Sequence, residues 1–274
     1  MNNPSPRHTQ LGNLLINEGQ RLLAARRRSP IPFVNPVRDP LDQRANALIS
    51  NIESFPHAFV LACVADQQGH YAGAWRLPEV VRSSLDTFDM QDLEALSQDD
   101  WESFTRHESV GRRFPKNVAK YLHSAVERIA AEYGGDASEM WSDRPTSARL
   151  VRRFLAFPGV GPKIANMAAN ILVREFKVNV ADTRNIDISA DVRIQRVMGR
   201  LGLADPDNAA DVIYAARDVY PAFPGIYDVT LWELGGKICP AGEPKCDQCW
   251  LVECCDYAEN SSASPSAGPS APLA

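Results

Sequence analysis

Four cysteines near the C-terminal end constrain the folding of this chain more than any other feature. Cys239, Cys246, Cys249 and Cys255 follow the pattern C-x6-C-x2-C-x5-C, with two prolines and a glycine in the first interval. Thiolates that converge from one short loop can hold an iron–sulfur cluster or a zinc ion. The spacing therefore predicts that this end of the protein folds around an inorganic group.

Other uses of these cysteines agree less well with the sequence. Cys254 brings the cluster to five cysteines, which would leave one thiol unpaired in a set of disulfides. Residues 1–20 are polar and lack the apolar core of a secretion signal, which favours a reducing compartment. Zinc ribbons usually carry two C-x2-C pairs, whereas this chain has one, formed by Cys246 and Cys249. The spacing therefore favours a 4Fe-4S cluster, and zinc is the alternative. We expect Cys254 to be a bystander and Cys63 to be a buried core thiol.

Length and charge leave room for two domains and for one specialised surface. The chain has 274 residues, is 45% hydrophobic and contains no apolar stretch long enough to span a membrane. A formal net charge of −5 argues against a general nucleic-acid binder, yet residues 149–200 carry ten Lys/Arg against four Asp/Glu. A basic segment on an acidic chain predicts that phosphates dock on one side only, although a solvated helix surface would give the same pattern.

The apolar periodicity predicts an all-α protein. Pro, Gly or Asp/Ser punctuation separates most of the segments with helical spacing, and prolines between residues 30 and 40 mark a linker. One segment, residues 176–189, alternates apolar and polar side chains, which predicts a small inserted β-hairpin. The Ser/Ala/Pro-rich tail after Tyr257 is expected to be disordered. We predict helices over residues 11–28, 41–52, 57–66, 71–75, 78–85, 90–95, 99–108, 114–133, 148–156, 162–173, 191–201, 209–219 and 226–235.

A short motif in the middle of the chain points to DNA. Residues 155–165 read LAFPGVGPKIA, in which a helix ends, Pro158–Gly161 form a tight turn and Pro162 begins a second helix. Gly159 and Gly161 allow close approach of a backbone, and the amides at the new helix start can bind a phosphate. This is the form of a helix–hairpin–helix motif, which contacts DNA backbone rather than base sequence. An ordinary connection between two helices is the alternative.

Three motifs in order resemble the endonuclease III family of DNA glycosylases. The stretch FPGVGPKIAN resembles the family's hairpin, DVRIQRV at residues 191–197 resembles its aspartate segment, and the cysteine spacing equals that of its cluster loop. The resemblance is close over residues 151–257 and looser over 41–150, and it does not extend to the insertion at 176–189 or to the C-terminal tail. It implies two helical domains flanking a DNA-binding cleft and a 4Fe-4S cluster held by Cys239, Cys246, Cys249 and Cys255.

The resemblance also implies a catalytic pair. It places the family's lysine at Lys163, whose neutral amine would attack C1′ of the flipped nucleotide and form a Schiff base. It places the family's aspartate at Asp191, which would stabilise positive charge on the deoxyribose and which also precedes a predicted helix as an N-cap. Asp182, in VADT, is the rival aspartate. We prefer Asp191 because the match continues through Arg196 and beyond.

Further positions are assigned to DNA. The turn at residues 66–69 occupies the place of the family's glutamine that fills the space left by the flipped base, so Gln67 is the candidate, with Gln68 second. His70, Tyr71 and Trp75 either line a base pocket or, for Trp75, pack in the core. The predicted DNA-binding residues are Gln67, Gln68, Pro158, Gly159, Val160, Gly161, Lys237 and Lys245.

The resemblance to the endonuclease III family implies a base-excision-repair enzyme. We expect a DNA glycosylase with β-elimination abasic-site lyase activity on damaged, oxidised pyrimidines. A monofunctional glycosylase and a weakly catalytic DNA-structure binder are the alternatives. The expected partner is damaged or abasic duplex DNA, bound by a monomer in the cytoplasm without contact to a membrane, on the nucleoid if the source is bacterial. The expected domains are 1–42 with 176–258 for the cluster, 43–175 for the barrel, and a disordered tail over 259–274.

Overall fold

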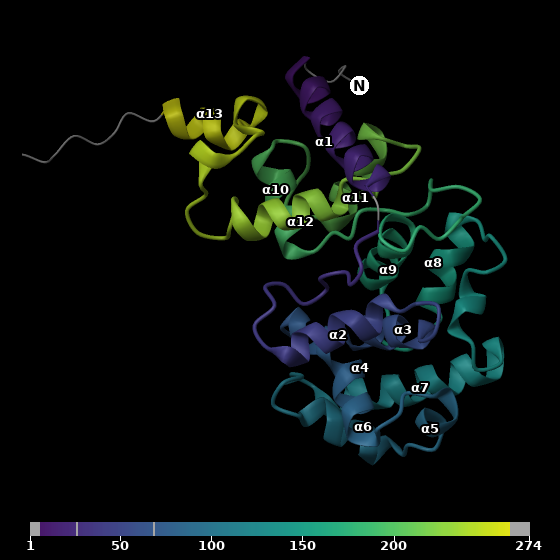
Figure 1. Cartoon of the computed structure of the whole chain (residues 1–274). Helices are drawn as coiled ribbons and strands as arrows, with labels where there is room; N and C mark the ends of the chain where they lie inside the picture. The colour runs from purple at the N-terminus through teal and green to yellow at the C-terminus, as the bar shows by residue number, and fades with distance from the viewer. Residues whose placement is uncertain (1–5, 26, 68, 264–274) are drawn as a thin grey trace, which may run out of the picture. The chain divides into compact units, whose positions relative to one another are not determined.

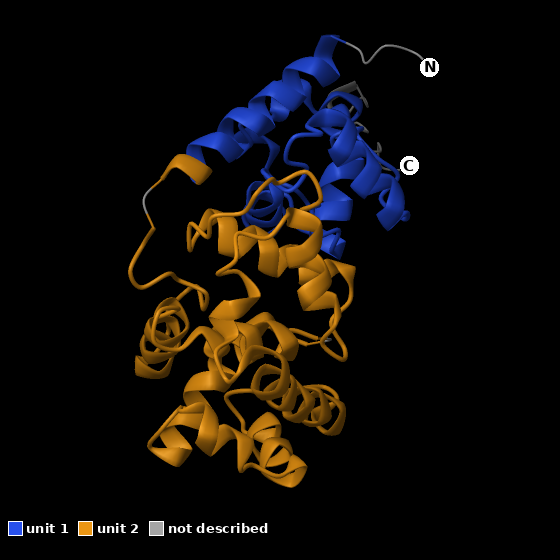
Figure 2. Cartoon of the chain, turned by 90° about the vertical axis from the view of Figure 1, so that its right-hand side faces the viewer, with its two compact units in different colours: residues 1–22, 187–274 blue, residues 23–186 orange. Residues whose placement is uncertain are grey.

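The computed structural model describes residues 6–25, 27–67 and 69–263, and these residues are helical without any strand. The predicted all-α class is therefore confirmed. The chain forms two compact units, of which unit 1 combines Met1–Leu22 with Asp187–Ala274 and unit 2 comprises Leu23–Ile186 (Figure 2).

Unit 2 is a helical domain, and proline at the first turn helps to begin four of its α-helices. Their order along the chain can be followed in Figure 1. The elements are α2 (Pro40–Ser50), α3 (Pro56–Ala65), α4 (Tyr71–Leu85), α5 (Met90–Glu94), α6 (Gln98–Arg106), α7 (Pro115–Tyr133), the 3-10 helix η1 (Ala137–Met140), α8 (Ser147–Leu155) and α9 (Pro162–Arg174).

Helix α3 is the centre of the unit 2 core. Its sequence, PHAFVLACVA, is apolar on nearly every side, and all ten of its residues are buried. A helix of this composition is stable only when other elements surround it. Helices α2, α4, α7 and α9 do so. Cys63 lies fully buried in this helix, which confirms the predicted core thiol.

The linker before α2 belongs to unit 2 because an aromatic cluster attaches it. Phe33 stacks on Trp75 with ring centroids 4.9 Å apart and on Phe176 at 5.9 Å. Phe59 of α3 packs edge-on against Phe176. The same contacts attach the start of the 176–189 segment to unit 2. Trp75 is 5% exposed, so it serves core packing, one of its two predicted uses.

The predicted β-hairpin at residues 176–189 is wrong. This segment is an irregular loop, because its backbone amides bond to other parts of the chain or make short-range turns and form no ladder between two strands. The amide of Val178 donates to the carbonyl of Leu172 at 3.0 Å, and the amide of Ala181 donates to the carbonyl of Pro145 at 2.9 Å. The apolar alternation does not reflect strand pairing, since Phe176 and the four consecutive residues 186–189 are the buried ones.

Unit 1 joins the two ends of the chain. Its elements are α1 (Pro6–Ala24, whose last residues lie in unit 2), α10 (Val192–Arg200), α11 (Ala209–Val219), α12 (Asp228–Lys237), the 3-10 helices η2 (Cys246–Gln248) and η3 (Val252–Cys254), and α13 (Asp256–Ala263). Helix α1 buries Leu11 and Leu15, and Gly19 lies so close to Ile226 that a Cβ would stand 2.7 Å from its carbonyl oxygen.

The first part of the tail that was predicted to be disordered is helical, because it belongs to α13. Ala258 is buried there, Glu259 pairs with Arg7 of α1, and His8 lies 3.8 Å from Asp256. The rest of the predicted tail, residues 264–274, lies outside the described residues. Among the helices that the structure describes, none has both the length and the apolar character needed to cross a membrane.

Candidate functional site

The turn between α8 and α9 is built from its own sequence. Gly159 adopts a φ of +80°, a conformation that favours glycine. A Cβ at this position would also stand 2.6 Å from Cδ2 of Tyr121 and would clash with Nε2 of Gln67. Val160 is buried beneath the turn, whereas Pro158 and Gly159 are exposed. The four predicted hairpin residues thus form one turn with an exposed backbone face.

Helix α9 presents an uncapped N-terminus directly after this turn. Gly161 is its N-cap and has no side chain to bond the first-turn amides, and Pro162 has no amide hydrogen of its own. Lys163 is the second residue of the helix and is exposed. Free amides at the positive end of a helix can bind a phosphate, so an anion held here would lie beside the lysine.

Gln67 follows α3 and faces the hairpin turn. Its Nε2 donates to the carbonyl of Val64 at 2.8 Å and is also the atom nearest to the position of a Cβ on Gly159. The structure therefore brings together Gln67 and Gly159, two predicted DNA contacts that are far apart in sequence. Gln68, the second candidate, lies outside the described residues.

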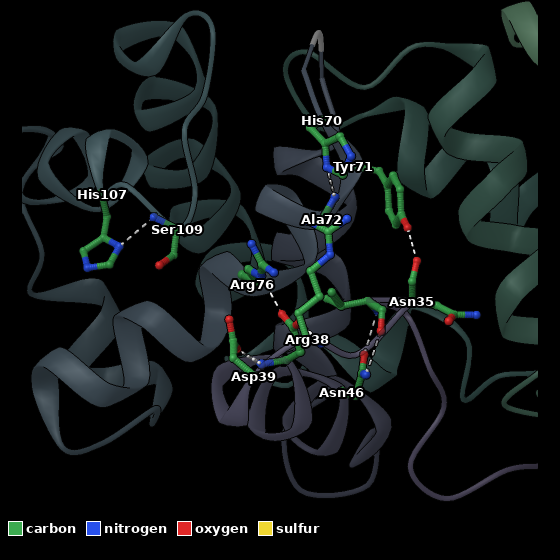
Figure 3. A network of polar contacts seen from close by, with 12 residues as sticks. Asn35, Arg38, Asp39, Asn46, His70, Tyr71, Ala72, Arg76, His107 and Ser109 are labelled. Atoms are coloured by element: carbon green, nitrogen blue, oxygen red, sulfur yellow. Dashed lines mark hydrogen bonds and ion pairs between the residues drawn. The ribbon is translucent and has the colours of Figure 1, made fainter. Parts of the chain in front are cut away.

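Residues after the Gln67 turn attach it to the linker and to α4. His70 is the N-cap of α4, its Nδ1 accepting from the amide of Ala72 at 3.3 Å, and the Tyr71 hydroxyl donates to the carbonyl of Asn35 (Figure 3). His70 is exposed and Tyr71 half-buried, so both side chains have access to the surface that Gln67 occupies.

A buried ion pair supports the same region. Asp42, fully buried, accepts from Nε of Arg76 at 2.6 Å and from the amide of Arg38 at 2.8 Å. Burial alone would raise the pKa of this carboxyl, but the Arg76 and Arg38 hydrogen bonds prevail and hold the pKa of Asp42 below its usual value. Helices α2 and α4 are joined by this contact.

Asp191 lies in unit 1 as the N-cap of α10. Its Oδ1 accepts from the amides of both Arg193 and Ile194 at 2.9 Å, and neither bond uses Oδ2. The chain before it is held by Asp228, a buried residue of α12 whose Oδ1 accepts from the amide and the hydroxyl of Ser189 at 2.5 and 2.6 Å. A half-buried carboxylate is therefore fixed at a helix start.

The rival aspartate occupies a different setting in unit 2. Asp182 accepts from the hydroxyl of Ser147 at 2.5 Å and from the amide of Arg184 at 3.1 Å. The Ser147 hydrogen bond lowers the pKa of Asp182 below its ordinary value. These contacts brace the 176–189 loop against α8, which gives Asp182 a local structural use.

The four cysteines of the predicted cluster loop line one cavity of unit 1. Cys239, Cys246, Cys249 and Cys255 all contribute to its wall, whereas Cys254, although buried, does not. Burial and the neighbouring thiols of Cys255 and Cys239 raise the pKa of Cys246 and of Cys249, so the sulfurs are close enough to affect one another. Within the described residues, no three His, Cys, Asp or Glu side chains form a ready site for a single metal ion.

Two arginines of α10 hold the cysteine loop, and this use was missed in the sequence. Arg200 donates to the Cys239 Sγ at 3.1 Å and to the carbonyls of Pro240 and Gly242 at 2.8 and 3.1 Å. Arg196 donates to the carbonyls of Cys239 and Gly235. The i, i+4 spacing in DVRIQRVMGR was the available signal. These two cations of the basic segment therefore bind this protein's own backbone.

The predicted lysines near the loop are solvent-exposed. Lys237 ends α12 and pairs with Glu233 at 3.2 Å, while Lys245 precedes η2. Glu243 is exposed between them in sequence. Lys237 therefore shares its charge with a carboxylate, and Glu243 adds a negative charge to the same loop.

The fold is that of the helix–hairpin–helix DNA glycosylases. A thermostable thymine-DNA glycosylase shares it with a TM-score of 0.60 and 14% identity, over 92% of this chain and 99% of that chain. A non-covalent endonuclease III–DNA complex shares it with a TM-score of 0.60 and 18% identity, over 93% of this chain and 99% of that chain. A trapped endonuclease III–DNA covalent intermediate, the estranged-adenine complex, matches with a TM-score of 0.61 and 17% identity over 93% of this chain and 98% of that chain.

The particular resemblance is to endonuclease III. The endonuclease III of Synechocystis sp. (strain ATCC 27184 / PCC 6803 / Kazusa) is 26% identical over 152 residues, which are 54% of this chain and 59% of the relative. The chain thus spans about three fifths of the length of that curated relative. A scan against models of known protein families returns no match. The resemblance to the endonuclease III family that the motifs indicated is confirmed.

Proposed function

We propose that this protein is a DNA glycosylase with abasic-site lyase activity on oxidised pyrimidines in duplex DNA. One observation carries the proposal: Lys163 is exposed on the first turn of α9, directly after a turn with an open backbone face. The likeness to endonuclease III in fold and sequence supports it. The proposed partner is a duplex with a damaged base or an abasic site, bound by one copy of the chain.

In the proposed reaction the amine of Lys163 attacks C1′ of the extruded nucleotide, and the damaged base leaves with its bonding electron pair. The amine nitrogen then loses a proton, the C1′–O4′ bond breaks with protonation of O4′, and a Schiff base forms at C1′. The Schiff base acidifies the C2′ hydrogens, and loss of one of them drives β-elimination, which breaks the bond from C3′ to the 3′ phosphate oxygen. Asp191 stabilises positive charge that develops on the sugar. Its two amide contacts support this assignment, because they fix one carboxylate oxygen and leave Oδ2 outside the cap.

DNA binding is proposed to begin at the hairpin turn. The amides of Gly159 and Gly161 and the α9 N-terminus bind backbone phosphates, which position the duplex without reading its sequence. Gln67, next to this turn, fills the space left by the extruded nucleotide. Lys237 and Lys245 add a modest contribution, since Glu233 and Glu243 oppose their charge.

The cysteine loop is proposed to hold a 4Fe-4S cluster through Cys239, Cys246, Cys249 and Cys255. All four thiols line one cavity, which fits a group that takes one thiolate at each of four irons. A zinc ion would need four sulfurs at about 2.3 Å from a single point. With every thiolate bound, the cluster has a structural use and leaves the chemistry to Lys163 and Asp191.

Borohydride trapping tests this function. Wild-type protein is incubated with abasic and thymine-glycol duplexes and reduced, and we expect a covalent adduct that disappears in Lys163→Gln. Adduct formation that persists in this variant would overturn the assignment of Lys163. Binding without base release or adduct would instead identify a DNA-structure-binding protein.

A second candidate is a monofunctional glycosylase. The thymine-DNA glycosylase fold matches this chain as well as endonuclease III does, with a TM-score of 0.60. Base release from mismatched thymine or uracil without a trapped adduct would favour it. The presence of Lys163 favours the first candidate, because relatives without lyase activity typically lack this lysine.

A further inference from the structure

A buried arginine contacts the turn that carries Gln67. Arg112 lies between α6 and α7 and is 6% exposed. Its Nη1 donates to the carbonyl of His70 at 3.0 Å, and its Nη2 donates to the carbonyl of Gln67. One guanidinium therefore bonds both ends of the turn between α3 and α4, which we call the α3–α4 turn and which comprises, among the described residues, Gln67, Gly69 and His70.

The turn is shaped to fit this arginine. A Cβ on Gly69 would stand 2.9 Å from Nη2 of Arg112, so the turn lies close against the guanidinium, and any other residue there would require the guanidinium to shift. On its other side, the amide of Arg112 donates to the carbonyl of Thr105 at 3.3 Å. The arginine thus connects the end of α6 to the α3–α4 turn.

Burying this cation requires specific compensation. Burial lowers the pKa of Arg112, while the charge of Asp66, itself buried, opposes that effect. A guanidinium keeps its charge at neutral pH and presents a planar set of donors, so two divergent carbonyls can be bound at once. A lysine ammonium is a point charge without that fork, and an apolar side chain would leave both carbonyls without this donor.

We propose that Arg112 is a positioning residue that fixes the α3–α4 turn and thereby holds Gln67 against the hairpin turn, ready to enter the duplex. The effect on catalysis that this inference implies rests on the proposed function. Its structural part, the ordering of the turn, stands independently. Arg112 itself acts through Gln67 and contacts neither base nor sugar.

Hydrogen exchange of the free full-length protein tests the structural part. In Arg112→Met we expect the amides of the α3–α4 turn, those of Gln67, Gly69 and His70, to exchange about tenfold faster, because local opening no longer breaks two hydrogen bonds. The matched control is Arg82→Met, which removes a half-buried arginine bound to Glu79 in the same unit. Equal exchange of the turn in Arg112→Met and wild type would overturn the proposal.

A double-mutant cycle tests the link to Gln67. Single-turnover base release is compared in wild type, Arg112→Met, Gln67→Ala and the double variant. We expect Arg112→Met to slow release about tenfold in the wild-type background and to have little further effect in the Gln67→Ala background, as contacting residues are coupled. Arg82→Met should retain the wild-type rate. Fully additive effects would contradict a role through Gln67.

Arg112→Lys separates charge from geometry and serves as the milder variant if Arg112→Met folds poorly. We expect faster turn exchange and slower release with Lys, because it cannot bind both carbonyls. Full rescue by Lys would overturn the two-carbonyl contact. If wild type releases no base from any duplex, the proposed function fails, whereas the exchange experiment still decides whether Arg112 orders the turn.

Discussion

The hairpin turn and the cysteine loop reach their conformations by different means. The hairpin turn, residues 156–161, joins two helices, and its course depends mainly on Gly159 and Pro162, with one distant donor, Arg128, bonded to the carbonyl of Ala156 at 3.0 Å. The cysteine loop, residues 239–255, contains only two 3-10 helices of three residues each. Its backbone is held by Arg196 and Arg200 from α10, which donate to the carbonyls of Cys239 and Pro240.

The conformation of the hairpin turn thus depends mainly on its own residues, whereas that of the cysteine loop depends on residues far away in the sequence. A turn specified mainly by its own residues should be most sensitive to replacement of its own glycine. A loop with little regular structure should depend on distant donors and on whatever its thiols bind. Variants of the hairpin turn and of the cysteine loop can distinguish these two cases.

Loss of a cluster ligand should have the largest effect. In Cys246→Ser we expect loss of bound iron and several kcal/mol of stability in unit 1, because metal binding to such a loop is coupled to its folding. Iron content, visible absorbance and hydrogen exchange of residues 239–255 measure it. Exchange of the hairpin turn should stay unchanged.

The control for this variant is the neighbouring thiol. Cys254→Ser should keep the iron, because Cys254 does not line the cavity of the other four cysteines. Retention of iron in Cys255→Ser together with its loss in Cys254→Ser would reverse the assignment of the fourth ligand.

Replacing the hairpin glycine should have the next largest effect. In Gly159→Ala we expect about 2–4 kcal/mol of destabilisation, from a left-handed backbone that costs an alanine about 1–2 kcal/mol and from crowding against Tyr121. Chemical denaturation measures the loss. Gly161→Ala is the matched control, because its φ is −93° and a Cβ there meets nothing within 4 Å. Equal losses in both variants would show that the turn is not specified in this way.

Removing an arginine that holds the loop should cost about 1–3 kcal/mol, since two carbonyls and a sulfur lose their donor in Arg200→Met. We expect faster release of iron to a chelator and faster exchange across residues 239–245. Arg196→Met should do the same to a smaller extent. An unchanged iron-release rate in both variants would mean that the loop needs no imported donors.

Much of this could be predicted from sequence because it is local. Helix periodicity, the glycines of the hairpin and the cysteine spacing each depend on neighbouring residues, and the helical class followed from them. The failures involve distant partners. Helix α13 is stabilised by contacts of Arg7 and His8 with residues 256–259, and a Ser/Ala-rich stretch gives no sign of these.

The candidate site also contains residues that local motifs reveal and residues that depend on distant partners. Lys163 and the Asp191 cap were assigned from short motifs. Arg112 could not be, because an arginine that binds backbone carbonyls 42 and 45 positions away leaves no pattern in the residues around it. For Arg200 the i, i+4 spacing with Arg196 was the available signal, but it does not identify the carbonyls that the side chain binds. The alternation at residues 176–189 was misinterpreted for a related reason. Its amides bond to Leu172 and Pro145, so an apparent strand pattern had no partner strand.

The smallest effect on stability is expected at the N-cap of α10, where it can be separated from chemistry. Asp191→Ala should cost about 1 kcal/mol, because the amides of Arg193 and Ile194 lose their acceptor. Asp191→Asn should be nearly neutral in thermal unfolding, since asparagine caps as well as aspartate does. If the carboxylate charge stabilises the sugar cation, both variants should nevertheless lose most base release, while Asp182→Asn keeps it. Retained activity in Asp191→Asn with activity lost in Asp182→Asn would transfer the role to Asp182, and with it the catalytic carboxylate from unit 1 to unit 2.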